Sequence, residues 1–228
     1  MVTFTEAYTV DTTADFSAAG TYVLRLSADD GELSASDEVT ITVNEPGGEV
    51  ITVEVQVPAS SDDAEERSSG SMGLTGSDLE LVYDRTDQQT VGMRFGVDIP
   101  RGATIVNAYL QFQADETGSG ETLLTIQGQD TDNAPTFTTS RGDISSRPRT
   151  TAAVAWSPAE WTAVGEVGPD QRTPDIAVVI QEIVNRPGWS SGNSLVIVIT
   201  GTGSRVAESY NGDQAGVPLL HVEYSTGG

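Results

Sequence analysis

Short segments of alternating apolar and polar residues, separated by turn-forming clusters, run through almost the whole of this 228-residue chain. Alternation with a period of two places every second side chain on one face of an extended strand, so these segments predict half-buried β-strands. Clusters of Gly, Ser, Asp, Asn and Pro separate them. The predicted strands cover residues 21–28, 38–43, 50–57, 79–83, 90–97, 104–114, 122–129, 152–156, 194–201, 206–210 and 219–224. So many short strands indicate an all-β, jelly-roll-like β-sandwich over residues 50–228.

One segment departs from this alternation and predicts a helix. Its apolar residues recur at helical spacing, at Ile176, Val179, Ile180, Ile183 and Val184. Thr173 can cap the segment, and Pro187 ends it. We expect one short amphipathic helix over about residues 174–186, packed on the sandwich.

The first 45 residues predict a separate, incomplete unit. Residues 21–28 and 38–43 are joined by Asp29-Asp30-Gly31-Glu32, which carries strong turn chemistry, so they form a hairpin. Residues 15–43 resemble the C-terminal half of PKD-type or related immunoglobulin-like domains. That resemblance implies a partial Ig-like segment, because a complete domain has two sheets and about 100 residues. Residues 46–49 are predicted to be a linker.

Composition excludes several classes of chemistry. The chain has 34 acidic residues, 11 arginines and one His, and it has neither Lys nor Cys. Lysine and cysteine nucleophiles, disulfides and Cys/His zinc sites are therefore excluded. A net charge of −23 opposes binding to nucleic acid and to anionic membrane surfaces. This acidic, Lys-free composition is typical of a secreted or cell-surface protein of a bacterium or archaeon.

Several motifs in residues 50–228 resemble the DNRLRE-type domains, which are related to one family of carbohydrate-binding modules. A strand ending in Arg94-Phe95 precedes an Ile-Pro-x-Gly-Ala-x-Ile turn at residues 99–105 and another strand at residues 108–112. Residues 189–193 and 218–224 fit the later elements of the same pattern. The resemblance implies a non-catalytic β-sandwich module attached to secreted polysaccharide-active enzymes or to cell-surface proteins.

The densest acidic cluster predicts a metal site. It consists of Asp62, Asp63, Glu65 and Glu66 and follows the predicted strand 50–57. Carboxylates so close together repel one another unless a cation neutralises them or all of them point into water. Ca²⁺ prefers hard oxygen ligands of this kind. We therefore predict a calcium site completed by Asp213, with Glu208 and Asn211 as further candidates. The alternative is a solvated acidic loop.

The aromatic residues suggest where a sugar could bind. Trp161 lies in a loop-like stretch and is the predicted stacking platform, with Tyr210 as a second aromatic contact. Sugar hydroxyl groups need polar partners, for which we select Arg205 and Asn211. The alternative is that the tryptophans are core residues, as most are.

These observations predict a non-catalytic, extracellular accessory module that binds polysaccharide or a cell-surface glycan, with calcium supporting its structure. A second hypothesis is a structural or adhesive module that self-associates by pairing of its N-terminal strands. A third is an enzyme that uses only carboxylates, because glycoside hydrolysis needs only two of them. The single His221 is interpreted as structural, since the sequence offers it no nucleophile motif.

Overall fold

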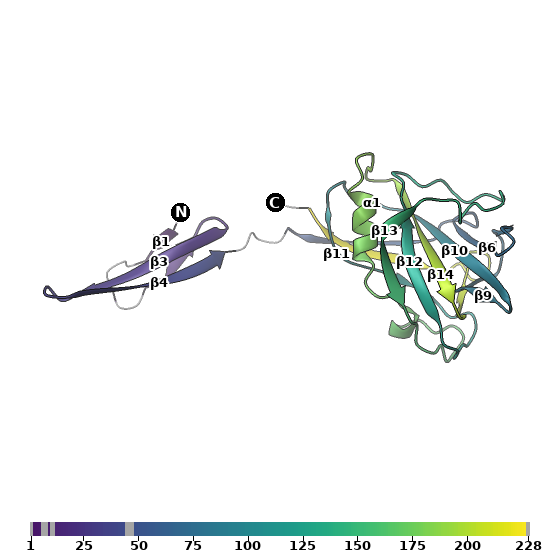
Figure 1. Ribbon diagram of the computed structural model, residues 1–228, viewed down its shortest axis with the longest axis horizontal. Coiled ribbons are helices and arrows are strands. Elements are labelled where there is room, and N and C mark those ends of the chain that lie inside the picture. Colours follow the sequence, from purple (N-terminus) through teal and green to yellow (C-terminus); the bar gives the residue numbers. More distant parts are fainter. Residues whose placement is uncertain (1, 6–8, 10–11, 44–47, 227–228) are drawn as a thin grey trace. The chain divides into compact units, whose positions relative to one another are not determined.

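The structure is a computed structural model that describes residues 2–5, 9, 12–43 and 48–226. The chain divides into two compact units, residues 1–49 and 50–226. Both are drawn in Figure 1. Residues 46 and 47 of the predicted linker lie outside the described residues.

In its described residues, the small unit forms two antiparallel strand pairs. β1 (Val2–Phe4) pairs with β2 (Ala14–Phe16), and β3 (Gly20–Asp29) pairs with β4 (Ser34–Val43). The predicted hairpin is confirmed, and its strands are longer than the predicted segments 21–28 and 38–43. The aspartates stabilise the turn: Asp29 Oδ1 accepts the Gly31 amide at 2.7 Å, and Asp30 Oδ1 accepts the Leu33 amide at 2.8 Å.

The large unit is an all-β sandwich with one α-helix among its described residues, which confirms the predicted fold class. Its elements are β5 (Val50–Gln56), β6 (Asp63–Arg67), β7 (Met72–Gly73), β8 (Asp78–Glu80), β9 (Tyr83–Asp84), β10 (Asp87–Gly96), β11 (Thr104–Gln111), β12 (Leu123–Gln129), β13 (Arg149–Trp156), the 3₁₀ turn Pro169–Gln171, α1 (Ala177–Val184), β14 (Ser194–Thr202), β15 (Val206–Glu208) and β16 (Leu219–Ser225).

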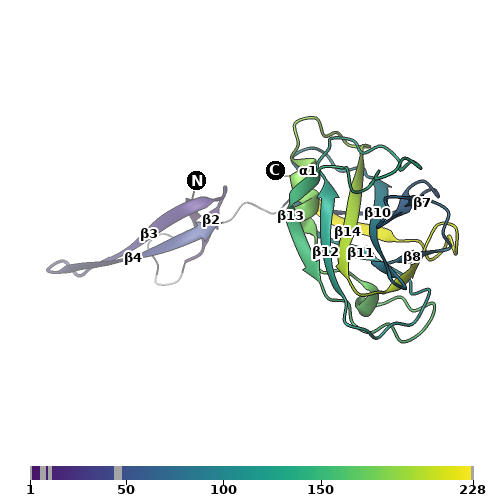
Figure 2. The same cartoon turned by 45° about the vertical axis from the view of Figure 1, so that its right-hand side comes forward.

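Two unequal sheets form the layers of the sandwich. The larger sheet has the order β13-β12-β14-β10-β6-β7, with β9 paired to β10, and the smaller has the order β11-β16-β5. β8 and β15 form a separate pair. The main core lies between the layers and includes Phe95, Leu110, Ile126 and Leu220, all fully buried. Figure 2 shows the broad sheet formed by β13, β12, β14 and β10.

The helix α1 contacts strands of both sheets. It packs against β11, β12 and β13, and its apolar face, including Ile180 and Ile183, belongs to the main core. The packing role predicted for this helix is confirmed, although the helix is shorter than expected. Thr173 does not cap it: its hydroxyl accepts the Leu110 amide at 3.0 Å, and Asp175 Oδ1 accepts the amide of Ala177 at 2.9 Å.

A second, smaller core lies on the opposite face of the larger sheet. Phe137 and Ile144, from the long connection between β12 and β13, pack there on Ala64, Val196 and Val198. This connection therefore covers the outer face of β6, β10 and β14. Among the described residues, no helix is long and apolar enough to cross a membrane.

Candidate functional site

Most of the acidic run that was predicted to bind calcium lies in a strand and not in a solvated loop, and this changes what its carboxylates can do. Asp63 to Arg67 form β6, which pairs antiparallel with β10. Alternate side chains of a strand point to opposite faces. Asp63 and Glu65 lie opposite the core residues Met93 and Val91, whereas Ala64 belongs to the second core. Four of the five predicted calcium ligands, all except Asp213, are therefore divided between two faces of the sheet.

The carboxylates on the outer face, those of Asp62 and Glu66, form hydrogen bonds with other groups of the protein. Asp62 forms an ion pair with Arg94 at 3.1 Å and accepts the Thr136 hydroxyl at 2.8 Å. Glu66 Oε2 accepts the amides of Ile144 and Ser145 at 2.8 and 2.7 Å. These contacts hold the β12–β13 connection on the sheet. Asp62 and Glu66 thus have a structural role in this arrangement. They lie on the face of β6 opposite Asp63 and Glu65.

The inward pair belongs to what we call the interior acidic cluster. Asp63 Oδ2 accepts the Tyr210 amide at 2.7 Å, and Glu65 Oε1 accepts the Glu80 amide at 2.7 Å. Two carboxyl pairs share hydrogen bonds, Glu65 with Glu80 and Glu208 with Asp115. The cluster comprises Asp63, Glu65, Asp78, Glu80, Asp115 and Glu208, and Asp63 and Glu65 are buried.

Burial raises the pKa of several carboxyl groups in this cluster. Burial is the largest cause for Asp63, whose pKa rises to about 6. It is also the largest cause for Glu65, and the hydrogen bond and charge of Glu80 add to it, so that the pKa of Glu65 rises to about 9. The pKa of Glu208 is raised by burial and by Asp115, and that of Asp78 by burial and by Glu80. A carboxyl pair of this kind holds a proton, or a cation in its place.

The predicted calcium site is not assembled as the sequence suggested. Among the described residues, no three His, Cys, Asp or Glu side chains are grouped so that they could hold one metal ion. Asp213 is exposed, although its amide donates to Glu208 Oε2 at 3.0 Å and so joins the edge of the interior acidic cluster. Asp63, Glu65 and Asp213 thus lie at the same end of the unit, while Asp62 and Glu66 belong to the other face of β6.

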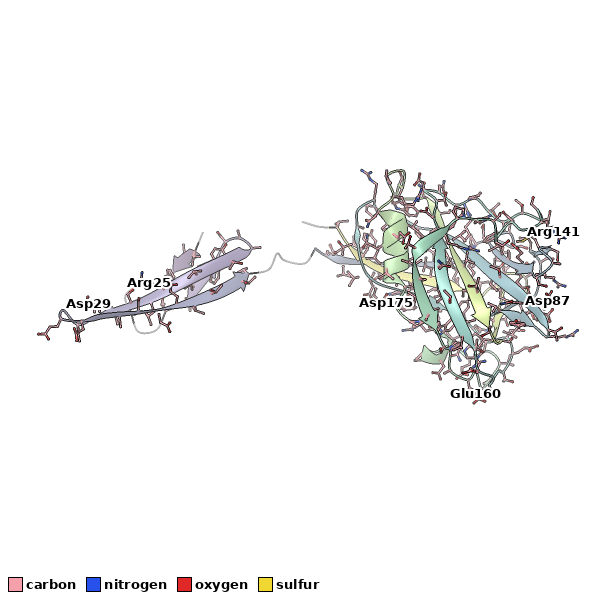
Figure 3. All side chains as sticks on the ribbon, viewed as in Figure 1. Arg25, Asp29, Asp87, Arg141, Glu160 and Asp175 are labelled. Carbon is pink, nitrogen blue, oxygen red and sulfur yellow. The ribbon has the colours of Figure 1, made fainter. Side chains whose placement is uncertain are left out.

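Trp161 is a core residue, and the prediction of a stacking platform there is wrong. It is fully buried, and its indole N–H donates to the carbonyl oxygen of Asp170 at 3.0 Å. Its neighbour Glu160 is exposed and lies at the rim of the unit (Figure 3). Trp156 and Trp189 are buried as well, so all three tryptophans are core residues, as the alternative interpretation predicted.

The predicted polar partners of a sugar separate into two kinds. Arg205 is 2% exposed and holds loops together: its guanidinium donates to the carbonyl oxygens of Ala159, Gly120 and Ser204. Burial lowers its pKa. Arg205 therefore cannot reach a ligand in this arrangement. Tyr210 is half-buried and Asn211 is exposed, so these two remain accessible beside the interior acidic cluster.

An exposed polar surface that the sequence prediction did not select lies on the smaller sheet. We call it the polar sheet face, and it presents the outward residues of β11, β16 and β5 together with Arg172. His221 Nδ1 lies 2.9 Å from Glu54 Oε1, and its ring stacks on Tyr109 at 4.4 Å. The Arg172 guanidinium lies 4.1 Å from the centre of the Tyr109 ring, and its Nε donates to Gln111 Oε1 at 3.0 Å. The structural role predicted for His221 is thus to brace this face.

A hollow of about 150 Å³ lies at one end of the polar sheet face. Three glutamines and several apolar side chains surround it: Gln56, Gln111, Gln113, Val167, Val217 and Leu219. Gln111 Nε2 donates to the carbonyl oxygen of Gly168 at 3.0 Å, which fixes the orientation of its amide. The alternation of β5 and β11 places Gln56 and Gln111 on the outward face, and this signal could have identified them from the sequence.

No family model and no curated protein matches the chain.

Proposed function

We propose that the chain is a non-catalytic accessory module of a secreted or cell-surface bacterial or archaeal protein, whose large unit binds polysaccharide with calcium supporting its structure. The observation that carries the proposal is the hollow on the polar sheet face, where three glutamines stand beside Val167, Val217 and Leu219. A sugar ring presents both hydroxyl groups and apolar C–H faces. Amide groups can donate to and accept from hydroxyl groups, and aliphatic side chains cover C–H surface.

The bracing of the face favours binding. Arg172 is held by Gln111 and by the Tyr109 ring, and His221 is held between Glu54 and Tyr109. Side chains that are ordered before a ligand arrives lose less conformational entropy when it binds. The resemblance to DNRLRE-type and carbohydrate-binding modules, stated from sequence, agrees with this proposal and remains a prediction.

Affinity electrophoresis in gels containing different polysaccharides, preceded by a glycan array, tests the proposal. We expect Gln56→Ala and Gln111→Ala to weaken retention about tenfold, which corresponds to roughly 1.4 kcal/mol. The matched control is Gln88→Ala, an exposed glutamine on β10 of the other sheet. Absence of retention on every glycan would contradict the proposal. Loss of retention in Tyr210→Ala alone would move the binding site to the loop after β15.

A specific observation favours self-association as a second function. None of the described residues of the small unit is buried, and Leu26 and Val39 are 74% and 54% exposed. In the described residues the β3–β4 hairpin is a two-stranded sheet of its own, so both outer strand edges present backbone groups that another strand can pair with. A second copy of the chain would cover the apolar face and extend the sheet.

Light scattering over a concentration series tests this second function. We expect the full chain to associate and Leu26→Lys to prevent it, because Leu26 lies on the apolar face with Tyr22 and Leu24. Ser27→Lys is the matched control, since its side chain points to the polar face. A full chain that stays monomeric, or a 50–226 fragment that associates equally, would exclude the hairpin as the interface.

A further inference from the structure

The only histidine of the chain, His221, lies with both ring nitrogens beside carboxylate oxygens. Its Nδ1 is 2.9 Å from Glu54 Oε1, and its Nε2 is 3.3 Å from Glu223 Oε1. An ionised carboxylate only accepts hydrogen bonds, whereas a neutral imidazole has one donor nitrogen and one acceptor nitrogen. The doubly protonated imidazolium is therefore the form of the ring that can donate to both carboxylates.

The groups around this ring come from all three strands of the smaller sheet. The register places His221 of β16 opposite Tyr109 of β11 on one side and Glu54 of β5 on the other, and Glu223 belongs to β16 itself. Arg172 lies on the Tyr109 ring. With the imidazolium, the charged side chains of this group carry two positive and two negative charges. Loss of the ring proton leaves one excess negative charge on the polar sheet face.

A series of contacts connects the imidazole to the hollow of the polar sheet face. The His221 ring stacks on Tyr109 with 4.4 Å between the ring centres and 9° between the ring planes. Arg172 lies 4.1 Å from the centre of the Tyr109 ring, and its Nε donates to Gln111 Oε1 at 3.0 Å. Gln111 lines the hollow. A change at the imidazole can thus reach the amide that is proposed to bind a sugar.

We propose that protonation of His221 holds Gln111 in its binding position, so that the polar sheet face binds its ligand more tightly at acidic than at alkaline pH. Imidazole is the side chain that ordinarily gains or loses a proton between about pH 5 and pH 8. When the ring is neutral, one of its nitrogens presents a lone pair to a carboxylate oxygen, and that hydrogen bond is lost. The ring then shifts on Tyr109, and the contact from Arg172 to Gln111 loosens. The inference rests on the proposed sugar binding at this face.

NMR of the full ¹⁵N-labelled chain tests the coupling without any glycan. Spectra between about pH 5.5 and pH 8.5 follow the single histidine and the side-chain amide of Gln111, which is identified by its absence in Gln111→Ala. We expect the Gln111 amide signals to shift together with the protonation of His221. The side-chain amide of Gln88, which donates to the Gly201 carbonyl oxygen on the larger sheet at 2.7 Å, is the internal control and should not shift with the histidine.

Variants separate His221 from other groups that titrate in this range. His221→Gln has no titrating ring, so its Gln111 amide should not respond to pH. Glu54→Gln, at an exposed side chain, should reduce the response, because the new amide can donate to or accept from either form of the ring. If His221→Gln does not fold, Glu54→Gln decides.

Asp63→Asn is the matched control. Burial raises the pKa of Asp63 to about 6, so this carboxyl group also titrates between the two pH values, but it belongs to the interior acidic cluster. Asp63→Asn should therefore keep the wild-type response of Gln111.

Affinity electrophoresis at the same two pH values tests whether the coupling reaches the ligand. The gels contain soluble xylan, β-glucan or galactomannan, and paired gels without polysaccharide correct for the change in charge of the chain. We expect retention of the wild-type chain to be about fivefold weaker at the higher pH, which is the effect of losing roughly one hydrogen bond. Retention of His221→Gln should be the same at both pH values.

Two results would overturn the proposal. The first is a Gln111 amide that does not follow His221, or that responds equally in His221→Gln. The second is wild-type retention that is equal at both pH values. If none of the polysaccharides is retained, the proposed function loses its support, whereas the spectra alone decide whether His221 controls Gln111.

Discussion

The two units of this chain have similar strand patterns but different interiors. The hairpin β3–β4 alternates apolar and polar residues as regularly as β11 or β16, yet none of the described residues of the small unit is buried. In the large unit the corresponding apolar faces meet between two layers, where residues such as Leu110 and Leu220 are fully buried. Alternation specifies a strand, whereas a second layer is needed to make a core.

The same contrast separates the two proposed functions. A unit with its own core can hold side chains in fixed positions for a ligand, as the polar sheet face does. A hairpin with open edges and an exposed apolar face presents unpaired backbone groups and apolar side chains to which another chain can bind.

The largest effect is expected from Trp161→Ala. The side chain is fully buried and its N–H is hydrogen-bonded to Asp170, so its removal leaves a large cavity. We expect a loss of about 3–5 kcal/mol in the free energy of unfolding, measured with urea. Val164→Ala, at a site that is 67% exposed, should change it by less than about 0.5 kcal/mol. Similar values for both variants would contradict the burial of Trp161.

Stability of the large unit should fall as the pH rises, when measured in EGTA. The pKa of Glu65 rises from an ordinary 4.5 to about 9 in the fold, so between these values the folded chain keeps a proton that the unfolded chain has lost. Its contribution is fully present below about pH 4.5 and is lost as the pH rises through about 9. Glu65→Gln should flatten this dependence of the melting temperature, because the amide does not titrate. Equal slopes for the two proteins would argue against the buried carboxyl pair.

Gly92→Ala tests the second core. A Cβ atom at this position would lie 2.6 Å from Phe137 Cζ, so Phe137 must move from its buried place on the sheet. We expect a loss of about 1–3 kcal/mol in the free energy of unfolding. Gly120→Ala is the control, since nothing lies within 4 Å of its Cβ position. A stable Gly92→Ala variant would mean that the β12–β13 connection does not pack on β10.

The smallest effect is expected in the hairpin. Leu26→Ala removes a side chain that is 74% exposed, so it should change the unfolding free energy of the dilute chain by less than about 0.5 kcal/mol. Leu220→Ala in the main core should cost about 2–5 kcal/mol. A large effect of Leu26→Ala at low concentration would show that the small unit has an interior of its own.

The fold class could be predicted because most strands of the large unit have one apolar face. β6 could not, because Asp63, Glu65 and Glu66 give it no apolar alternation. The inward burial of Glu65 depends on Glu80, which belongs to another strand. For the same reason the sequence predicts that the metal ligands lie together, whereas the strand places them on two faces. Trp161 was misplaced because Pro158 and Gly165 around it indicate a loop, and the sequence does not show that this loop is tied inward by Arg205.

The most direct test of the account is calorimetric titration of the full chain and of residues 50–226 with the polysaccharide that the array identifies. We predict the same affinity for both proteins and about tenfold weaker binding for Gln111→Ala in either, because the binding face belongs to the unit that has a core. Loss of binding when residues 1–49 are removed would contradict this prediction. Unchanged binding in Gln111→Ala would contradict it as well.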